Sequence, residues 1–263
     1  MTASAATLTV RTLGLVPYRE GLRLQDECVR ARADGESGDT LLLLEHPPVL
    51  TAGRGTGEGS VKADAETLAR TGLEVVPVSR GGDVTWHGPG QLIGYPICDV
   101  AGRDHDLHRF LRGLEQGLLD SLQRWGVDAH RTEGRTGVWV GERKLASIGI
   151  AVRRWVTYHG FALNVRPDLS HFELIHPCGL QGVRMTSMAE LLGPSCPAWS
   201  EVLAAVSADV ALALGYESVR GSLMAGLLED ANWSDTALGP GAMATADVNS
   251  GAHSAPRPGG IAA

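Results

Sequence analysis

The chain has 263 residues, of which 43% are hydrophobic and 20% are charged, and its formal net charge is -7. The ordinary apolar content excludes disorder throughout and is enough for one large or two small domains. No apolar run reaches the ~18–20 residues that span a bilayer, and the N-terminus shows no signal-peptide pattern. We therefore expect a cytoplasmic protein without membrane segments, and the acidic balance disfavours general nucleic-acid binding.

The patterns along the chain predict alternating groups of strands and helices. In chain order they predict a strand at 7–16, a helix at 19–33, a strand at 40–45, a glycine-rich loop at 51–62, and strands at 75–78, 84–86 and 91–97. An amphipathic helix at 107–125, a hairpin of 137–140 with 144–152, a strand at 158–165 and helices at 200–214 and 223–230 follow. Hairpins between helices predict an α+β fold with a mixed, mostly antiparallel sheet flanked by helices.

The C-terminal end differs in composition from the rest of the chain. Between residues 235 and 263, 16 of 29 residues are Gly, Ala or Pro. Such a segment buries too little apolar surface to offset the entropy of ordering it. We therefore expect a folded domain over residues 1–232 and a disordered Ala/Gly/Pro-rich tail over 233–263.

The basic residues are strongly biased toward arginine. There are 21 Arg and two Lys, Lys62 and Lys144. Arg keeps its proton near neutral pH, whereas Lys gives it up when burial or a neighbouring charge lowers its pKa. Lys62 lies in polar, glycine-rich sequence, whereas Lys144 begins the apolar run 144–152. Lys144 is therefore a candidate for a chemical role, with an ordinary structural lysine as the alternative.

The segment with the most chemical information is Arg80-Gly-Gly-Asp-Val-Thr-Trp-His-Gly-Pro-Gly-Gln91. Its four Gly and one Pro in twelve residues indicate unusual backbone angles or a close approach to a ligand. A tight structural loop is the alternative, but it leaves the polar side chains without a purpose. A second segment, Tyr158 to Asn164, places Gly160 inside an apolar strand, which marks a bulge or the close approach of a ligand.

Cys178 differs from the other three cysteines, Cys28, Cys98 and Cys196, because it lies between Pro and Gly on a stiff turn. A free thiol titrates near ~8.5 and becomes a strong nucleophile only beside a cationic group. Lys144 or a nearby His is a candidate for that group. No pair of cysteines has the spacing of a metal knuckle, so we expect no metal.

Four segments together resemble the octanoyltransferases of lipoate biosynthesis, which share a fold with the biotin and lipoate protein ligases. They are 80–91, 144–149 (Lys-Leu-Ala-Ser-Ile-Gly), 159–164 (His-Gly-Phe-Ala-Leu-Asn) and 177–179 (Pro-Cys-Gly). The similarity extends from about residue 10 to residue 215, and the tail lies outside it. The resemblance implies a biotin/lipoate protein ligase-like fold, with residues 1–232 as the catalytic domain.

The resemblance also implies roles for individual residues. Cys178 is expected to hold the acyl group as a thioester, and Lys144 to lower the pKa of that thiol and act as acid and base. The implied substrate-binding residues are Arg80, Gly81, Gly82, Asp83, Val84, Thr85, Trp86, His87, Ser147, Ile148, Gly149, Gly160, Phe161 and Ala162.

The implied activity is transfer of an octanoyl group from octanoyl-acyl carrier protein to a lysine of lipoyl domains. The implied acceptors are the lipoyl domains of 2-oxo acid dehydrogenase complexes and the glycine-cleavage H protein. No cofactor is required, because a thioester donor drives amide formation, and we expect a monomer. The alternatives are an ATP-dependent lipoate or biotin ligase on the same fold, a cysteine-dependent thioesterase and a non-catalytic acyl-binding module.

Overall fold

The computed structural model describes residues 6–102, 105–176, 183–223 and 236–237. A large mixed sheet forms the centre of the fold, with its strands in the order β13-β12-β1-β2-β6-β10-β9-β8-β7 and β11 beside β9. These strands are β1 (Thr7–Leu15), β2 (Thr40–Glu45), β6 (Gln91–Ile97), β7 (His130–Thr132), β8 (Arg135–Val140), β9 (Arg143–Arg153), β10 (Val156–Asn164), β11 (Arg184–Met185), β12 (Ser218–Leu223) and β13 (Thr236–Ala237).

Most strand pairs of this sheet are antiparallel. The exceptions in the described chain are β1 with β2, β1 with β12, and β9 with β11, which pair in parallel. A small second sheet has the order β4-β3-β5. Its strands are β3 (Val49–Ala52), β4 (Val75–Pro77) and β5 (Thr85–His87). The predicted α+β class with a mixed, mostly antiparallel sheet is confirmed.

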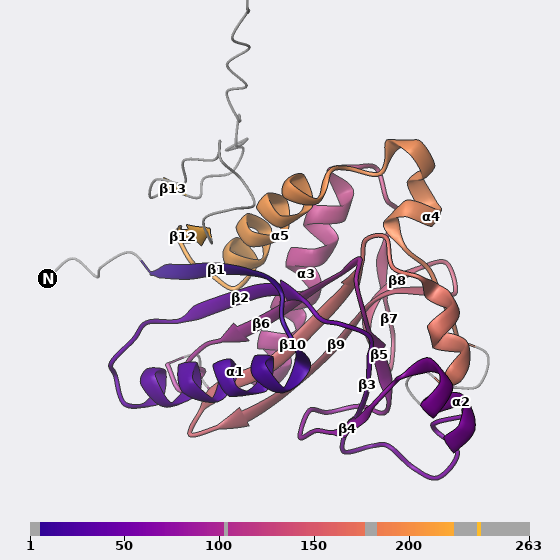
Figure 1. Ribbon diagram of the computed structural model, residues 1–263. Helices are drawn as coiled ribbons and strands as arrows, with labels where there is room; N and C mark the ends of the chain where they lie inside the picture. The colour runs from indigo at the N-terminus through magenta and orange to yellow at the C-terminus, as the bar shows by residue number, and fades with distance from the viewer. Residues whose placement is uncertain (1–5, 103–104, 177–182, 224–235, 238–263) are drawn as a thin grey trace, which may run out of the picture.

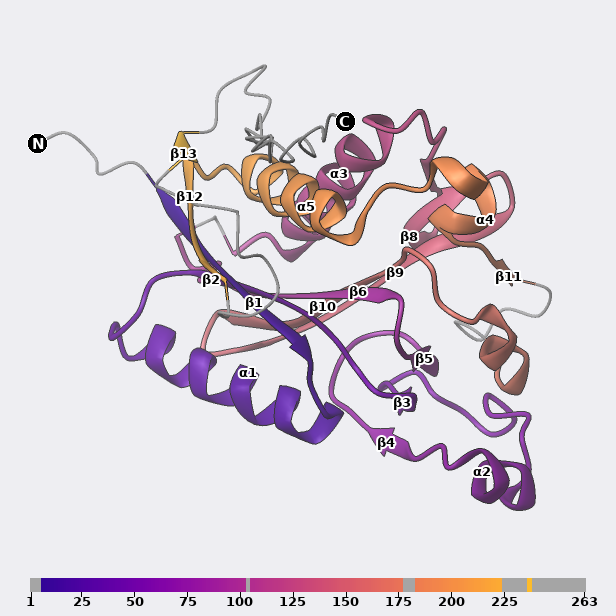
Figure 2. The ribbon, with the colours of Figure 1, turned by 45° about the horizontal axis from the view of Figure 1, so that its top comes forward.

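Helices cover both faces of the large sheet. The helices of the described chain are α1 (Tyr18–Ala33), α2 (Ala65–Thr71), α3 (Leu107–Gln123), α4 (Met188–Leu192) and α5 (Trp199–Ala213), with 3₁₀ turns η1 (Leu169–Leu174) and η3 (Gly193–Ser195). Figures 1 and 2 show α1 on one face, α3 and α5 together on the other, and the small sheet with α2 beyond one end. No helix of the described chain is both long and apolar enough to cross a membrane.

The position of β2 between two helical layers explains its uninterrupted leucines. Leu41 and Leu43 pack in the core that contains the buried residues of α3 and α5, whereas Leu42 and Leu44 pack in the core that contains Val29 of α1. Successive side chains of a strand point to opposite faces, so a strand covered on both faces is apolar at every position. The predicted bounds of this strand, 40–45, are confirmed.

The amphipathic helix predicted at 107–125 is α3. Its N-cap is Asp106, whose carboxylate accepts the Arg109 N–H at 2.9 Å. Leu114, Leu118 and Leu122 are fully buried, as their i, i+4 spacing predicts. This helix packs on α5 and closes the larger core.

Two predictions differ from the structure. The loop predicted at 51–62 begins with the end of β3, and α2 was not expected. The helix predicted at 223–230 is wrong at its first residue, because Leu223 ends β12; residues 224–230 lie outside the described chain. The polar segment Ser218–Leu223 forms a strand because it pairs in parallel with β1, a contact that no local pattern indicates.

Candidate active site

A cavity of about 510 Å³, measured out to its open mouth, lies where β9 and β10 face the loop that precedes β5. Thirteen of the fourteen predicted substrate-binding residues line it. They are Arg80, Gly81, Gly82, Asp83, Val84, Thr85, His87, Ser147, Ile148, Gly149, Gly160, Phe161 and Ala162.

Trp86 is the predicted binding residue whose side chain lies elsewhere. Its ring stacks on His171 at 4.9 Å between centroids and meets Phe172 edge-on at 5.4 Å. Thr85 and His87 flank Trp86 on β5 and both line the cavity. Because neighbouring side chains of a strand point to opposite faces, Trp86 must point away from the cavity into the small core.

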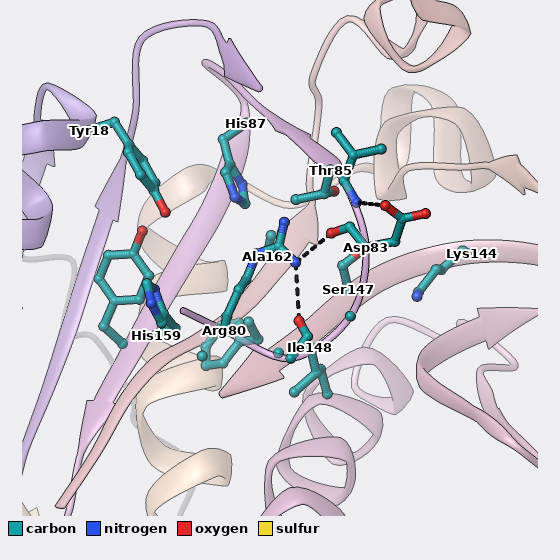
Figure 3. Close-up of a pocket in the computed structure, with 17 residues that line it drawn as sticks. Tyr18, Arg80, Asp83, Thr85, His87, Lys144, Ser147, Ile148, His159 and Ala162 are labelled. Atoms are coloured by element: carbon teal, nitrogen blue, oxygen red, sulfur yellow. Dashed lines mark hydrogen bonds between the residues drawn. The ribbon is translucent and has the colours of Figure 1, made fainter. Parts of the chain in front are cut away.

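Arg80 holds the glycine-rich loop in shape with its guanidinium group. Its Nη2 donates to the Thr51 carbonyl at 2.7 Å and to Thr51 Oγ1 at 2.8 Å, and its Nη1 donates to the Asp83 carbonyl at 2.6 Å. Figure 3 shows this side chain at the centre of the cavity lining. The planar fork of Arg, with donors in a fixed geometry, suits such a bridge between two segments.

The loop lies directly on β9. The Gly81 N–H donates to the Ile150 carbonyl at 3.1 Å, and a Cβ atom on Gly149 would come 2.9 Å from the Gly81 carbonyl oxygen. That contact is closer than real Cβ atoms tolerate, so a side chain at 149 would push the loop off the strand. Gly160 likewise allows a close approach, because a Cβ there would lie 2.0 Å from the Gly94 carbonyl oxygen. The close neighbour at Gly160 is thus the backbone of β6, and the predicted approach of a ligand there stays a prediction.

A chain of buried polar side chains connects the cavity to the segment beside Lys144. Asn164 Nδ2 donates to the Thr186 carbonyl at 2.9 Å, so its Oδ1 faces Gln91, whose Nε2 donates to it at 2.9 Å. Gln91 Oε1 therefore accepts from His87 Nδ1 at 3.0 Å. These assignments leave His87 Nε2 as an acceptor that faces Thr51 Oγ1 at 3.4 Å. Each amide orientation follows from its neighbour, because a carbonyl oxygen only accepts.

Lys144 lies on β9 at one end of the cavity lining, opposite His159 (Figure 3). It is 3% exposed, and its Nζ lies over the Trp139 ring at 5.2 Å from the centroid. An indole face attracts an ammonium group electrostatically. The main-chain carbonyl of Lys144 accepts the Thr186 N–H at 3.0 Å, and Met185 of β11 pairs in register with Lys144.

Cys178 lies outside the described residues, as do its neighbours Pro177 and Gly179. The described chain on either side of this segment has defined positions. The His176 N–H donates to the Ser60 carbonyl at 2.8 Å, and Arg184 begins β11 beside β9. Arg184 and Met185, which follow this segment, therefore pair with Arg143 and Lys144 of β9.

Two tyrosines complete the cavity lining, and the sequence contained no local signal for them. Tyr18 begins α1, and Tyr95 comes from the middle of β6. Tyr95 Oη lies 2.7 Å from His46 Nε2, and His46 Nδ1 lies 2.6 Å from the Val16 carbonyl. The carbonyl only accepts, so Nδ1 carries the proton and the Tyr95 hydroxyl donates to Nε2. The Tyr95 oxygen thus offers only lone pairs to any further partner.

Three histidines in and beside the cavity are neutral at neutral pH. Burial lowers the pKa of His46 to about 4, that of His159 to about 4 and that of His87 to about 3. Arg80 adds a smaller repulsive contribution to the pKa of His87 and His159. The imidazoles therefore add no charge to a cavity that Arg80, Asp83 and Lys144 also line. Across the described chain, no three His, Cys, Asp or Glu side chains are grouped as ligands for a metal ion.

Comparison with known proteins places the chain in a family. Residues 17–209 match the model of the lipoyl protein ligase A/B catalytic domain. The chain is 49% identical over 199 residues to an octanoyltransferase of Geobacter sulfurreducens, covering 76% of this chain and 81% of that protein. It is 51% identical over 183 residues to an octanoyltransferase of Citrifermentans bemidjiense, covering 70% of this chain and 86% of that protein. The chain belongs to the lipoyl protein ligase A/B family. Its octanoyltransferase relatives identify it as an acyltransferase of protein lipoylation.

Solved structures of lipoate protein ligases have the same fold as this chain. A lipoate-protein ligase A bound with ATP superposes with a TM-score of 0.63 at 16% identity, over 84% of this chain and 90% of that one. A bi-partite lipoate protein ligase from Thermoplasma acidophilum superposes with a TM-score of 0.59 at 16% identity, over 82% of this chain and 86% of that one. The expected biotin/lipoate protein ligase-like fold is therefore confirmed at the level of the lipoate ligases.

Proposed function

We propose that this protein transfers an octanoyl group from octanoyl-acyl carrier protein to a lysine of lipoyl domains through a thioester on Cys178. The observation that carries the proposal is the place of Lys144. It is buried at one end of the cavity that thirteen of the predicted substrate-binding residues line, next to the strand that follows the segment with Cys178. The names of the curated relatives support octanoyl as the acyl group.

The first half-reaction forms the acyl-enzyme. The Lys144 ammonium favours the thiolate of Cys178, which attacks the carbonyl carbon of the octanoyl thioester. As the carbon–sulfur bond to the carrier breaks, Lys144 gives its proton to the departing pantetheine sulfur. The products are an octanoyl thioester on Cys178, a neutral Lys144 and the free carrier thiol. Lys144 then has no proton to give until the second half-reaction.

The second half-reaction uses Lys144 as the base. The neutral amine of the acceptor lysine attacks the Cys178 thioester, and Lys144 takes the proton that the amine loses. The amide bond forms, the carbon–sulfur bond breaks, and the thiolate and ammonium pair is restored. A thioester is converted to an amide, so the reaction runs downhill without ATP.

The cavity supplies the environment for the acyl chain. Ile148, Phe161 and Ala162 present apolar side chains, and the histidines around them carry no charge at neutral pH. Main-chain N–H groups of the glycine-rich loop are candidates for stabilising the oxyanion of the tetrahedral intermediate. We further propose that the catalytic domain comprises residues 1–232 and that the protein acts in the cytoplasm.

The test is the intact mass of the protein after mixing with octanoyl-acyl carrier protein in the absence of acceptor. The wild type should gain one octanoyl group and Cys178→Ala none, and adding a lipoyl domain should transfer the label to it. Acceptor acylation by Cys178→Ala would overturn the thioester intermediate. Acylation only with free octanoate and ATP would instead identify an ATP-dependent ligase.

A further inference from the structure

The pairing of β8 with β9 is irregular at the position of Lys144. Trp139 pairs with Lys144, but the residue before it, Val138, pairs with Ala146. Leu145 is therefore one residue more on β9 than β8 supplies, which makes this point a bulge. A one-residue shift of this kind reverses the face to which the residues on one side of the bulge point.

The bulge decides which face of the sheet Lys144 joins. Ala146 and Ile150 lie in the larger core with the buried residues of α3 and α5. Regular alternation would place Lys144 in this core as well, since it is two residues before Ala146. Instead Leu145 joins the core, and Lys144 lines the cavity together with Ser147 (Figure 3). The shift of register thus converts a core position into a position in the candidate active site.

The ladder on the other side of β8 is interrupted as well. Three residues of β8, 136–138, face only Arg131 of β7. The N–H of Gly137, the middle residue of these three, donates to Glu115 Oε1 of α3 at 3.1 Å. A Cβ atom on Gly137 would clash with Lys144 Cε, so this backbone lies directly against the lysine. A helix outside the sheet therefore supplies the hydrogen-bond acceptor for the strand segment that borders Lys144.

The carboxylate of Glu115 is held so that one oxygen remains for Gly137. Its Oε2 accepts from Arg112 Nη1 at 2.6 Å and from Arg131 Nε at 3.1 Å. Glu115 is 1% exposed, whereas the side chains of Arg112 and Arg131 reach solvent. An ionised carboxylate only accepts and takes donors on both oxygens, so these three donors together fix its position. Glu115 is not among the residues that line the cavity.

We propose that Glu115 is a positioning residue for acyl transfer, which holds the irregular segment of β8 in the shape that turns Lys144 into the cavity. This inference rests on the proposed function and adds to it a residue that acts through Lys144 without touching the substrate. Without an acceptor at position 115, the Gly137 N–H would be a buried, unpaired donor, which folded proteins avoid. Gly137 would then move to another acceptor, and the Lys144 side chain that packs on it would move too.

The test compares three substitutions of Glu115 by the single-turnover rate of octanoyl transfer from acyl carrier protein to a lipoyl domain. Glu115→Leu removes the acceptor and should slow transfer about 100-fold, the effect of misplacing a reacting group by about 1 Å. Glu115→Gln loses the charge but keeps an acceptor oxygen of the same reach, so it should recover most of the rate. Glu115→Asp keeps the charge but is one methylene too short for Gly137, so it should also be slow.

A Lys144→Ala background shows whether Glu115 acts through the lysine. No amine is left to position in this background, so Glu115→Leu should change the remaining rate little. Effects that are independent of each other would instead multiply. The concentration of octanoyl-acyl carrier protein that gives half the maximal rate should stay at the wild-type value in Glu115→Leu, because Glu115 does not line the cavity.

Asp209→Leu is the matched control. Asp209 is another buried carboxylate between α3 and α5, and it is ion-paired to Arg124 at the end of α3. Like Glu115→Leu, this substitution removes a buried acceptor from arginine, but it leaves Gly137 in place. It should lower stability in urea and leave the rate of the folded protein unchanged.

The outcomes separate the two proposals. A wild type that transfers no octanoyl group, or a Lys144→Ala variant as fast as the wild type, would overturn the proposed function. With those results in order, a wild-type rate in folded Glu115→Leu would overturn only the role of Glu115. An equal loss in the Lys144→Ala background or in Asp209→Leu would also overturn it, because either marks a general weakening of the fold. If Glu115→Leu does not fold, a wild-type rate in Glu115→Asp overturns the role in its place.

Discussion

Gly137 lies directly against the side chain of Lys144. A Cβ atom on Gly137 would come 2.7 Å from Lys144 Cε and 3.4 Å from Nζ. Gly137 has a φ of 128°, and its N–H donates to Glu115 Oε1 at 3.1 Å. Glu115 is itself buried and ion-paired to Arg112 and Arg131. A buried carboxylate on α3 thus fixes the position on β8 that leaves room for the lysine.

Replacing Gly137 with Ala should displace Lys144 and lower the rate of acyl transfer. The methyl group would come 2.5 Å from the Ala146 carbonyl oxygen and 2.7 Å from Lys144 Cε, so both the backbone of β9 and the lysine must shift. A shift of about 1 Å in a reacting group costs about 100-fold in rate. Single-turnover transfer and thermal unfolding of the variant measure the two effects separately. Gly134→Ala is the matched control: its φ is also positive, at 70°, but a Cβ there meets nothing within 4 Å. Equal rate losses in the two variants would contradict a role for Gly137 in placing Lys144.

Lys144→Arg should retain the positive charge and lose turnover. Arg does not release its proton near neutral pH, so it neither protonates the leaving thiol nor takes the proton of the acceptor amine. General acid–base catalysis contributes about 100- to 10,000-fold, and a loss in turnover of that size is expected. Lys62→Arg, which changes the other lysine, should leave turnover unaltered. Wild-type rates in Lys144→Arg would exclude Lys144 as acid and base.

Asn164→Asp should destabilise the protein and slow the reaction. The change removes the Nδ2 donor to the Thr186 carbonyl and places a carboxylate beside that oxygen. An unsatisfied buried acceptor costs about 1–3 kcal/mol, which urea denaturation measures. The rate should fall as well, because the Thr186 N–H holds the main chain of Lys144. Gln123→Glu makes the same chemical change on the exposed face of α3, and stability equal to that control would contradict the prediction.

The folded protein should lose stability as the pH falls from about 6.5 toward 4. Burial lowers the pKa of His46 from 6.5 to about 4, so folding favours its neutral form. The stabilisation is present in full above the unfolded pKa and is lost as protons bind the unfolded chain first. For His46 alone the free energy of unfolding falls by about 3 kcal/mol when the pH reaches about 4.

His46→Gln tests this pH dependence. The amide can donate to the Val16 carbonyl and accept from Tyr95 without titrating, so the fall in stability between pH values near neutrality and acid should be smaller. Urea denaturation at several pH values between about 6.5 and 4 gives the slope of the free energy of unfolding against pH. His108→Gln, exposed on α3, should keep the wild-type slope. An identical slope in His46→Gln would mean that His46 is not buried as a neutral imidazole.

Several features of the fold and site follow from local sequence. The continuous leucines 41–44 predicted a short buried strand, and the i, i+4 leucines of α3 predicted a helix with one buried face. The resemblance of four segments to the octanoyltransferases named thirteen residues that line one cavity. Alternation of side chains along a strand also predicts that Trp86 points away from that cavity. The resemblance nevertheless named Trp86 as a binding residue.

Other features depended on the tertiary structure. One such feature is the pairing of β12 with β1, which joins segments far apart in the chain. Another is the cavity itself, which Tyr18 and Tyr95 line together with residues distant from them in sequence. A third is His159, which lines this cavity and a second one beside α1. Arg80 was expected at the ligand, and the structure shows that its guanidinium also bridges Thr51 and Asp83. Local periodicity determines which residues are buried. The order of strands in the sheet determines which of these buried residues meet, and no short stretch of sequence contains that order.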